Sequence, residues 1–113
     1  MDIREEVEGG ICRLELGGEL TVYQATEIKT TLVAALQGHS VLEFRLGAVG
    51  EIDTAGLQLL ILIKREAMAM KKTFRMVERS HAVTEIIGLF DMDEFFDDAI
   101  QTQQMNSACG GQL

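Results

Sequence analysis

The segment Glu51–Leu57 reads EIDTAGL, and it lies where a strand pattern gives way to a helix pattern. Asp53 suits the N-cap of that helix, since its carboxylate can accept hydrogen bonds from the amides of Ala55 or Gly56. Thr54 then falls at the first helical position with its hydroxyl outward, and Gly56 lets another chain approach the first turn closely. On these residues alone, an ordinary capped helix is the simpler interpretation, and a contact site is the functional one.

The sequence on either side of this segment alternates between strand and helix patterns. Apolar residues at every second position predict strands, and apolar residues three and four apart predict helices. Strands are predicted at residues 3–7, 11–16, 41–46 and 73–77, and helices at residues 21–38, 53–71 and 80–90, the last capped by Ser80. The order β-β-α-β-α-β-α predicts parallel strands joined by right-handed crossovers, with helices covering at least one face of the sheet.

Local signals predict where some of these elements end. Gly17 and Gly18 are predicted to end the second strand, and residues 47–51 are predicted to form a loop after the third strand. Thr21 is predicted to cap the first helix, with Gln24 three residues later completing a capping box.

The helix predicted after Asp53 is apolar around most of its circumference. One face carries Leu57, Leu60, Ile61 and Met68, and another carries Leu59, Leu62, Ile63 and Met70. Such a helix is either covered on both sides or exposes an apolar stripe. Burial beneath the neighbouring helices is the favoured interpretation, and a partner-binding stripe near Thr54 is the functional alternative.

The composition is that of one globular domain with an acidic bias. The chain has 113 residues, of which 47% are hydrophobic and 25% charged, a balance typical of folded proteins. Its net charge of −8 repels nucleic-acid phosphates and anionic membrane surfaces, so neither is an expected partner. No apolar run approaches the ~20 residues of a membrane span, and the charged N-terminus lacks a signal sequence. We therefore expect a cytoplasmic protein with reduced thiols.

The sequence contains no pattern typical of a metal or catalytic site. Cys12 lies in an alternating apolar stretch and Cys109 in a polar, glycine-rich tail, without zinc-ligand spacing. His39 and His81 stand at the ends of predicted elements, with no Cys or carboxylate arrangement nearby. No phosphate-cradling glycine loop or nucleophile elbow is present. We expect no catalytic residues, no cofactor and no bound metal, zinc and calcium included, and therefore a protein that is not an enzyme.

Three segments together resemble the STAS domain family, which includes the anti-sigma factor antagonists. Residues 51–67, EIDTAGLQLLILIKREA, are similar to the family's Asp-Ser-Ser-Gly-type motif at a helix start, which reads Asp53-Thr54-Ala55-Gly56 here. The tetrapeptide GELT at residues 18–21 is similar to the family's Gly-Glu-Leu-Asp, and residues 80–92 resemble its third helix and following turn. The resemblance covers about residues 3–100. It implies a small STAS-type mixed β-sheet with helices packed mainly on one face.

The resemblance also implies domain limits and a phosphorylation switch. Residues 1–100 form the STAS domain, of which residues 91–100 are a last strand or helix, and residues 101–113 form a flexible tail. In anti-sigma factor antagonists, a partner serine/threonine kinase that doubles as the anti-sigma factor phosphorylates the hydroxyl residue after the Asp. That residue is Thr54 here. The implied partner-binding residues are Asp53, Thr54, Ala55, Gly56, Leu57 and Thr21.

The sequence departs from the family pattern at three positions. The acceptor is Thr54 in place of the commoner Ser, Ala55 removes a second hydroxyl, and Arg45 stands where the family often has Asp or Asn. Arg45 is either a cation that pairs with Asp53 or with a phosphate on Thr54, or an ordinary surface side chain.

Two other functions stay open as alternatives. One is a non-switching STAS subunit of a chemosensory or lipid-transporter complex. The other is a receiver-like phosphotransfer domain, since Asp53 follows a strand near mid-chain. A receiver is disfavoured because Glu5 and Glu6 precede the place where an acidic metal-binding pair would close its first strand. Glu78 and Arg79 also stand where a receiver needs a lysine.

Overall fold

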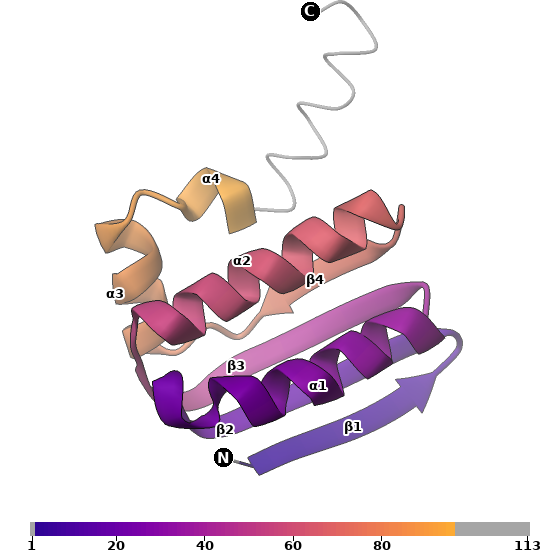
Figure 1. Cartoon of the computed structure of the whole chain (residues 1–113), viewed down its shortest axis with the longest axis horizontal. Coiled ribbons are helices and arrows are strands. Elements are labelled where there is room, and N and C mark those ends of the chain that lie inside the picture. The colour runs from indigo at the N-terminus through magenta and orange to yellow at the C-terminus, as the bar shows by residue number, and fades with distance from the viewer. Residues whose placement is uncertain (1, 97–113) are drawn as a thin grey trace, which may run out of the picture.

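The computed structural model describes residues 2–96, in which helices cover one face of a mixed four-stranded sheet (Figure 1). The elements in chain order are β1 (Asp2–Glu8), β2 (Ile11–Leu20), α1 (Val22–Gly38), β3 (Val41–Ile52), α2 (Thr54–Ala69), β4 (Thr73–Val77), α3 (His81–Leu89) and α4 (Asp93–Phe96). The strand order is β1-β2-β3-β4, with β1 antiparallel to β2 and the other neighbours parallel. The predicted fold class is confirmed, and the predicted tail lies outside the described residues. None of the helices within residues 2–96 is long and apolar enough to cross a bilayer.

The core lies between the sheet and the two long helices. Alternation along the strands turns one row of apolar side chains toward α1 and α2, which lie side by side across this face (Figure 1). The strands bury Cys12, Leu14, Leu16, Leu42, Phe44, Leu46, Phe74 and Met76. The helices bury Ile28, Leu32, Leu36, Leu57, Leu59, Leu60 and Ile63. The favoured burial of α2 is confirmed for most of its length, although Met68 and Met70 near its end are exposed.

The opposite face of the sheet is charged. Arg13 lies 3.2 Å from Glu43, and Arg45 lies 3.8 Å from Glu43 and 3.3 Å from Glu78, measured between side-chain nitrogen and oxygen atoms. Such partly exposed pairs each contribute little to stability, but they leave this face polar. Arg45 therefore pairs with carboxylates of the sheet face and of Glu78, and not with Asp53.

Strands β2 and β3 run further than the sequence predicts. The predicted strand end at Gly17 and Gly18 and the predicted loop at residues 47–51 are wrong, because the two segments pair with each other as far as Leu20 and Ile52. A register irregularity follows Gly18, whose φ of +99° is readily adopted only by glycine. Since β2 and β3 end together, the helices that follow them begin side by side at one end of the sheet.

A lysine is buried in the core between α2 and the last helix. Lys64 is 1% exposed, and its Nζ atom lies 5.8, 5.3 and 5.8 Å from the ring centroids of Phe74, Phe95 and Phe96. Aromatic faces attract a cation at such distances. This contact links α2 to both β4 and α4.

Candidate functional site

Asp53 accepts hydrogen bonds from the starts of two helices. Its Oδ1 atom lies 3.0 Å from the backbone nitrogen of Gly56 in α2, and its Oδ2 atom lies 3.0 Å from that of Val22 in α1. Burial raises the pKa of the Asp53 carboxyl, but hydrogen bonds from the amides of Gly56, Val22 and Ala55 outweigh burial and leave the pKa below its ordinary value. Asp53 is therefore an ionised carboxylate at neutral pH, and its predicted role as the N-cap of α2 is confirmed.

Thr21 does not form the predicted capping box. Its side chain accepts no hydrogen bond from the first turn of α1, and its hydroxyl instead donates to the side-chain oxygen of Gln24 over 2.6 Å. The backbone amide of Val22, the first residue of α1, donates its hydrogen bond to Asp53, which is the N-cap of α2. Thr21 is only 5% exposed, and its side chain is therefore a structural group that a partner protein would not reach.

Thr54 is exposed at the first position of α2. A modifying enzyme can reach a hydroxyl at this position, and the helix start presents backbone amides and the positive end of the helix dipole. The adjacent residue Asp53 carries a negative charge, and Glu51, three residues before Thr54, is exposed. The predicted exposure of Thr54 is confirmed, and its phosphorylation stays a prediction.

Gly56 packs against the chain's own backbone. A Cβ atom at position 56 would lie 2.1 Å from the carbonyl oxygen of Leu20 and 3.0 Å from Cγ1 of Ile52. The glycine is therefore required for the close approach of α2 to the end of β2. Leu57 is also buried, with 3% exposed. The interpretation of Gly56 as a notch open to another chain is wrong, since both Gly56 and Leu57 are buried within the chain.

The accessible surface beside Thr54 is formed by the N-terminal halves of α1 and α2. A shallow hollow of about 200 Å³ between these helices is lined by Ala25, Thr26, Lys29, Ala55, Gln58, Leu59 and Leu62. Val22 and Tyr23, which begin α1, are 56% and 88% exposed. The residues of the hollow together with Val22, Tyr23 and Thr54 are referred to as the α1–α2 surface. It combines apolar groups with the exposed hydroxyl residue Thr54.

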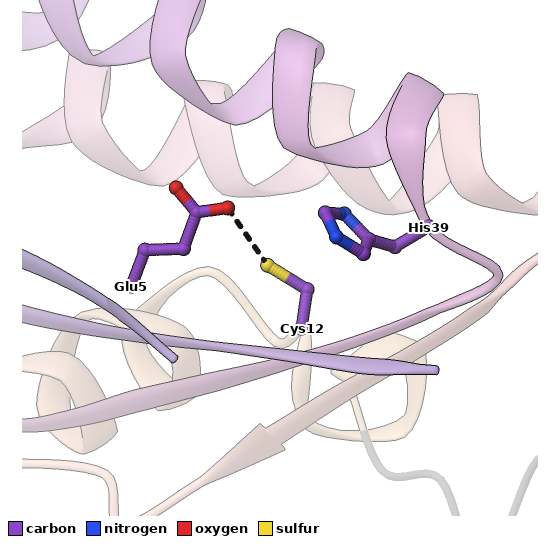
Figure 2. A group of neighbouring side chains, drawn as sticks. All are labelled: Glu5, Cys12 and His39. Carbon is purple, nitrogen blue, oxygen red and sulfur yellow. Dashed lines mark hydrogen bonds between the residues drawn. The ribbon is translucent and has the colours of Figure 1, made fainter. Parts of the chain in front are cut away.

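A second cluster of chemically active side chains was missed by sequence reasoning. Glu5 of β1, Cys12 of β2 and His39, which follows α1, come together near the start of the parallel strands (Figure 2). The expectation that no Cys or carboxylate lies near His39 is wrong. Antiparallel pairing aligns Glu5 with Leu14 and Val7 with Cys12, so Glu5 and Cys12 are diagonal neighbours on one face of the sheet. This proximity depends on strand register, which residue spacing alone does not reveal.

The fold and the site define a class of small α/β domains in which an exposed threonine begins a helix capped by aspartate. The chain belongs to the STAS domain family, since a family model described as "Mlab, STAS domain" matches residues 3–102. The family resemblance noted in the sequence is thereby confirmed. No curated protein matches the chain.

Solved structures share the fold at low sequence identity. An anti-sigma factor antagonist from Mycobacterium paratuberculosis is 23% identical with a TM-score of 0.75, over 84% of this chain and 81% of that chain. The Bacillus cell fate determinant SpoIIAA in its phosphorylated form is 17% identical with a TM-score of 0.68, over 95% and 99%. A sulfate transporter family protein from Wolinella succinogenes is 18% identical with a TM-score of 0.69, over 82% and 76%. These likenesses show the fold.

Proposed function

We propose that this chain is a protein-binding switch of the anti-sigma factor antagonist type, controlled by phosphorylation of Thr54. The observation that carries this proposal is the exposed hydroxyl of Thr54 at the start of α2, beside the α1–α2 surface. The fold likeness to SpoIIAA in its phosphorylated form supports it. The partner is a serine/threonine kinase that acts as an anti-sigma factor. In this proposal the chain works in the cytoplasm by binding and not by catalysis.

A phosphate on Thr54 would act mainly on the surface potential. It adds about −1.5 to −2 charges at neutral pH. The amide of Gly56 already donates to Asp53, so the first turn has fewer free donors to offer a phosphate. The carboxylates of Asp53 and Glu51 also oppose a third negative group. Phosphorylation would therefore change docking more than it changes folding.

The apolar part of the α1–α2 surface supplies the contact that such a charge would disrupt. Tyr23 and Val22 are exposed beside the helix starts, and aromatic side chains are enriched where proteins bind one another. A phosphate at the edge of a packed apolar contact must lose water or expel the partner. The proposed contact residues that remain are Asp53, Thr54 and Ala55. The buried residues beneath this surface have a structural role, and they are Thr21, Gly56 and Leu57.

The test is a pull-down from native lysate with the wild-type chain, Thr54→Glu and Thr54→Ala, followed by mass spectrometry of residue 54. We expect the wild type and Thr54→Ala to retrieve a kinase, and Thr54→Glu to retrieve much less of it. Phosphate should be found on Thr54 of the wild type. The matched control is Thr84→Glu, which places the same charge on an exposed threonine of α3. Equal retrieval by Thr54→Glu and wild type, with no phosphate on Thr54, would show that the switch is wrong.

A second candidate is a non-switching STAS subunit of a larger complex, of the chemosensory or lipid-transporter kind. The observation that favours it is the family model, whose description names Mlab and not an anti-sigma factor antagonist. A constitutive subunit would co-purify with transporter or chemosensory components. It would do so to the same extent whether residue 54 is Thr, Ala or Glu.

A further inference from the structure

The cluster of Glu5, Cys12 and His39 brings together three kinds of metal-binding atom. Within residues 2–96, one sulfur, one ring nitrogen and one carboxylate oxygen of these residues all lie within 4.8 Å of one another. The Cys12 thiol donates to Oε2 of Glu5 over 3.5 Å. Figure 2 shows the three side chains pointing toward a common space from separate parts of the chain. Sulfur and imidazole together favour zinc and similar transition metals over calcium or magnesium.

The imidazole of His39 is already oriented as a ligand. Its Nδ1 atom lies 3.0 Å from the carbonyl oxygen of Ala35, and because a carbonyl only accepts, Nδ1 carries the proton. The lone pair is then on Nε2, the nitrogen that Figure 2 shows turned toward Cys12. Metal-binding histidines commonly donate their second ring N–H to such a carbonyl, which fixes the tautomer and the ring orientation.

Cys12 and Glu5 differ in burial in a way that suits a metal site. Cys12 is 0% exposed, whereas Glu5 lies on the surface of the edge strand β1. Burial raises the pKa of the Cys12 thiol to about 11, and the neighbouring Glu5 contributes to the rise. Without a metal the thiol is therefore protonated, but a divalent cation reverses this balance and deprotonates a coordinating thiol. Glu5 is the exposed member of the cluster, and His39 is half-buried.

We propose that Glu5, Cys12 and His39 form a three-ligand site for Zn²⁺ or a similar borderline divalent metal, with water in the fourth position. Binding forms a Zn–S bond and breaks the S–H bond of Cys12, whose proton passes to solvent. Zinc–ligand distances of about 2.0–2.3 Å require neighbouring ligand atoms to lie roughly 3.3–3.8 Å apart. Cys12 and Glu5 already lie 3.5 Å apart, so any contraction, of about 1 Å at most, is between His39 and the other two ligand atoms.

The proposed metal site is independent of the proposed switch. His39 precedes β3 and Thr54 follows it, so the two sites lie at opposite ends of that strand. A metal there would tie the edge strand β1 to β2 and to the end of α1. Because it binds the folded chain, the metal should also raise the midpoint of thermal unfolding. Failure of either proposal leaves the other standing.

The experiment titrates the full, chelator-treated chain with Zn²⁺ against a chromophoric chelator, and repeats the titration with Co²⁺ while recording its absorption spectrum. The test variants are Cys12→Ala, His39→Gln and Glu5→Gln. The matched controls are His81→Gln, which alters the other histidine, and Cys109→Ser, which alters the other cysteine. Circular dichroism establishes that each variant is folded. Glu5→Gln and His39→Gln keep the test decisive if the buried Cys12→Ala variant does not fold.

We expect one zinc per wild-type chain and per control chain. Cys12→Ala and His39→Gln should each weaken zinc binding by about 100-fold or more. Loss of an outer-shell group, by comparison, typically weakens metal binding by about 10–100-fold. The Co²⁺ complex should show a thiolate-to-metal charge-transfer band that is absent in Cys12→Ala. Zinc affinity that is the same in wild type, His39→Gln and Glu5→Gln would overturn the proposal, as would a wild-type Co²⁺ spectrum without a thiolate band.

Discussion

Asp53, which immediately precedes α2, accepts a hydrogen bond over 3.0 Å from the backbone amide of Val22, at the start of α1. The same carboxylate accepts from Gly56 within its own helix. The side chain of Asp53 therefore accepts hydrogen bonds from amides at both helix starts and links the start of α1 to the start of α2. The α1–α2 surface depends on this shared acceptor.

Replacing Asp53 should cost more stability than replacing an ordinary N-cap. Loss of a cap typically costs about 0.5–2 kcal/mol, and here a second helix also loses its acceptor. We expect Asp53→Ala to lower the free energy of unfolding by about 2 kcal/mol or more in urea denaturation. Ser80→Ala is the matched control, since Ser80 caps only α3 through the amide of Val83, and it should cost about 1 kcal/mol. Equal losses would show that the bond to Val22 contributes nothing.

The contribution of Asp53 should depend on pH. The pKa of Asp53 in the folded chain lies below its ordinary value. The ionised carboxylate therefore stabilises the fold fully at a pH above the ordinary pKa, and this stabilisation is lost as the pH falls through the folded-state pKa. We therefore expect the difference in unfolding free energy between wild type and Asp53→Asn to be largest near pH 7 and to shrink below about pH 4. Chemical denaturation at several pH values measures it. A difference that stays constant down to pH 3 would contradict the assignment.

Adding one methyl group at Gly56 should damage the fold. The new Cβ would lie 2.1 Å from the carbonyl oxygen of Leu20, so α2 or the end of β2 must move. We expect Gly56→Ala to destabilise the chain by about 1–3 kcal/mol. Gly38→Ala is the control, because no atom from another part of the chain lies within 4 Å of the would-be Cβ of this helical glycine. Gly38→Ala should leave stability unchanged or raise it by up to about 1 kcal/mol.

Thr54→Glu should leave the stability of the isolated domain nearly unchanged. Thr54 is exposed, and a negative charge there gains from the helix dipole while it is repelled by Asp53 and Glu51. We expect a change in unfolding free energy of less than about 0.5 kcal/mol. Thermal and urea unfolding measure it. A large loss would mean that reduced partner retrieval by this variant reports unfolding instead of docking.

The Cys12 thiol should resist alkylation in the folded, metal-free chain. Its burial and its pKa of about 11 leave little thiolate near neutral pH. In a Cys109→Ser background, we expect iodoacetamide to modify Cys12 far more slowly in buffer than in urea. The urea reaction is the internal control, because unfolding restores an ordinary thiol. Equal rates would show that Cys12 is accessible.

The parts of the site that the sequence predicts are those governed by local chemistry. Asp53 is the N-cap of α2 and Thr54 its first residue, so local capping preferences place both of them correctly. The bond from Val22 to Asp53 joins residues 31 positions apart, and it exists only because β2 and β3 end together. Thr21 is the N-cap residue of α1, as the sequence predicts, but its side chain makes no capping bond.

The remaining errors share a physical origin in strand pairing. The glycines and charges of residues 47–51 resemble a loop, yet the partner segment of β2 supplies the backbone hydrogen bonds that make them a strand. Glu5, Cys12 and His39 lack any spacing motif because their proximity comes from sheet register and from the turn after α1. The burial of Gly56 likewise depends on the backbone of Leu20, a contact that its local sequence does not contain.

The edges of the sheet have a consequence for behaviour at high concentration. β1, the outer strand beside β2, carries Asp2, Arg4, Glu5, Glu6 and Glu8. The other outer strand, β4, has only five residues and exposes Arg75 at its centre. Long, flat, apolar edges recruit further strands into aggregates, whereas charged or short edges resist this. Both borders of this sheet are therefore protected against the edge-to-edge polymerisation that exposed strands otherwise invite.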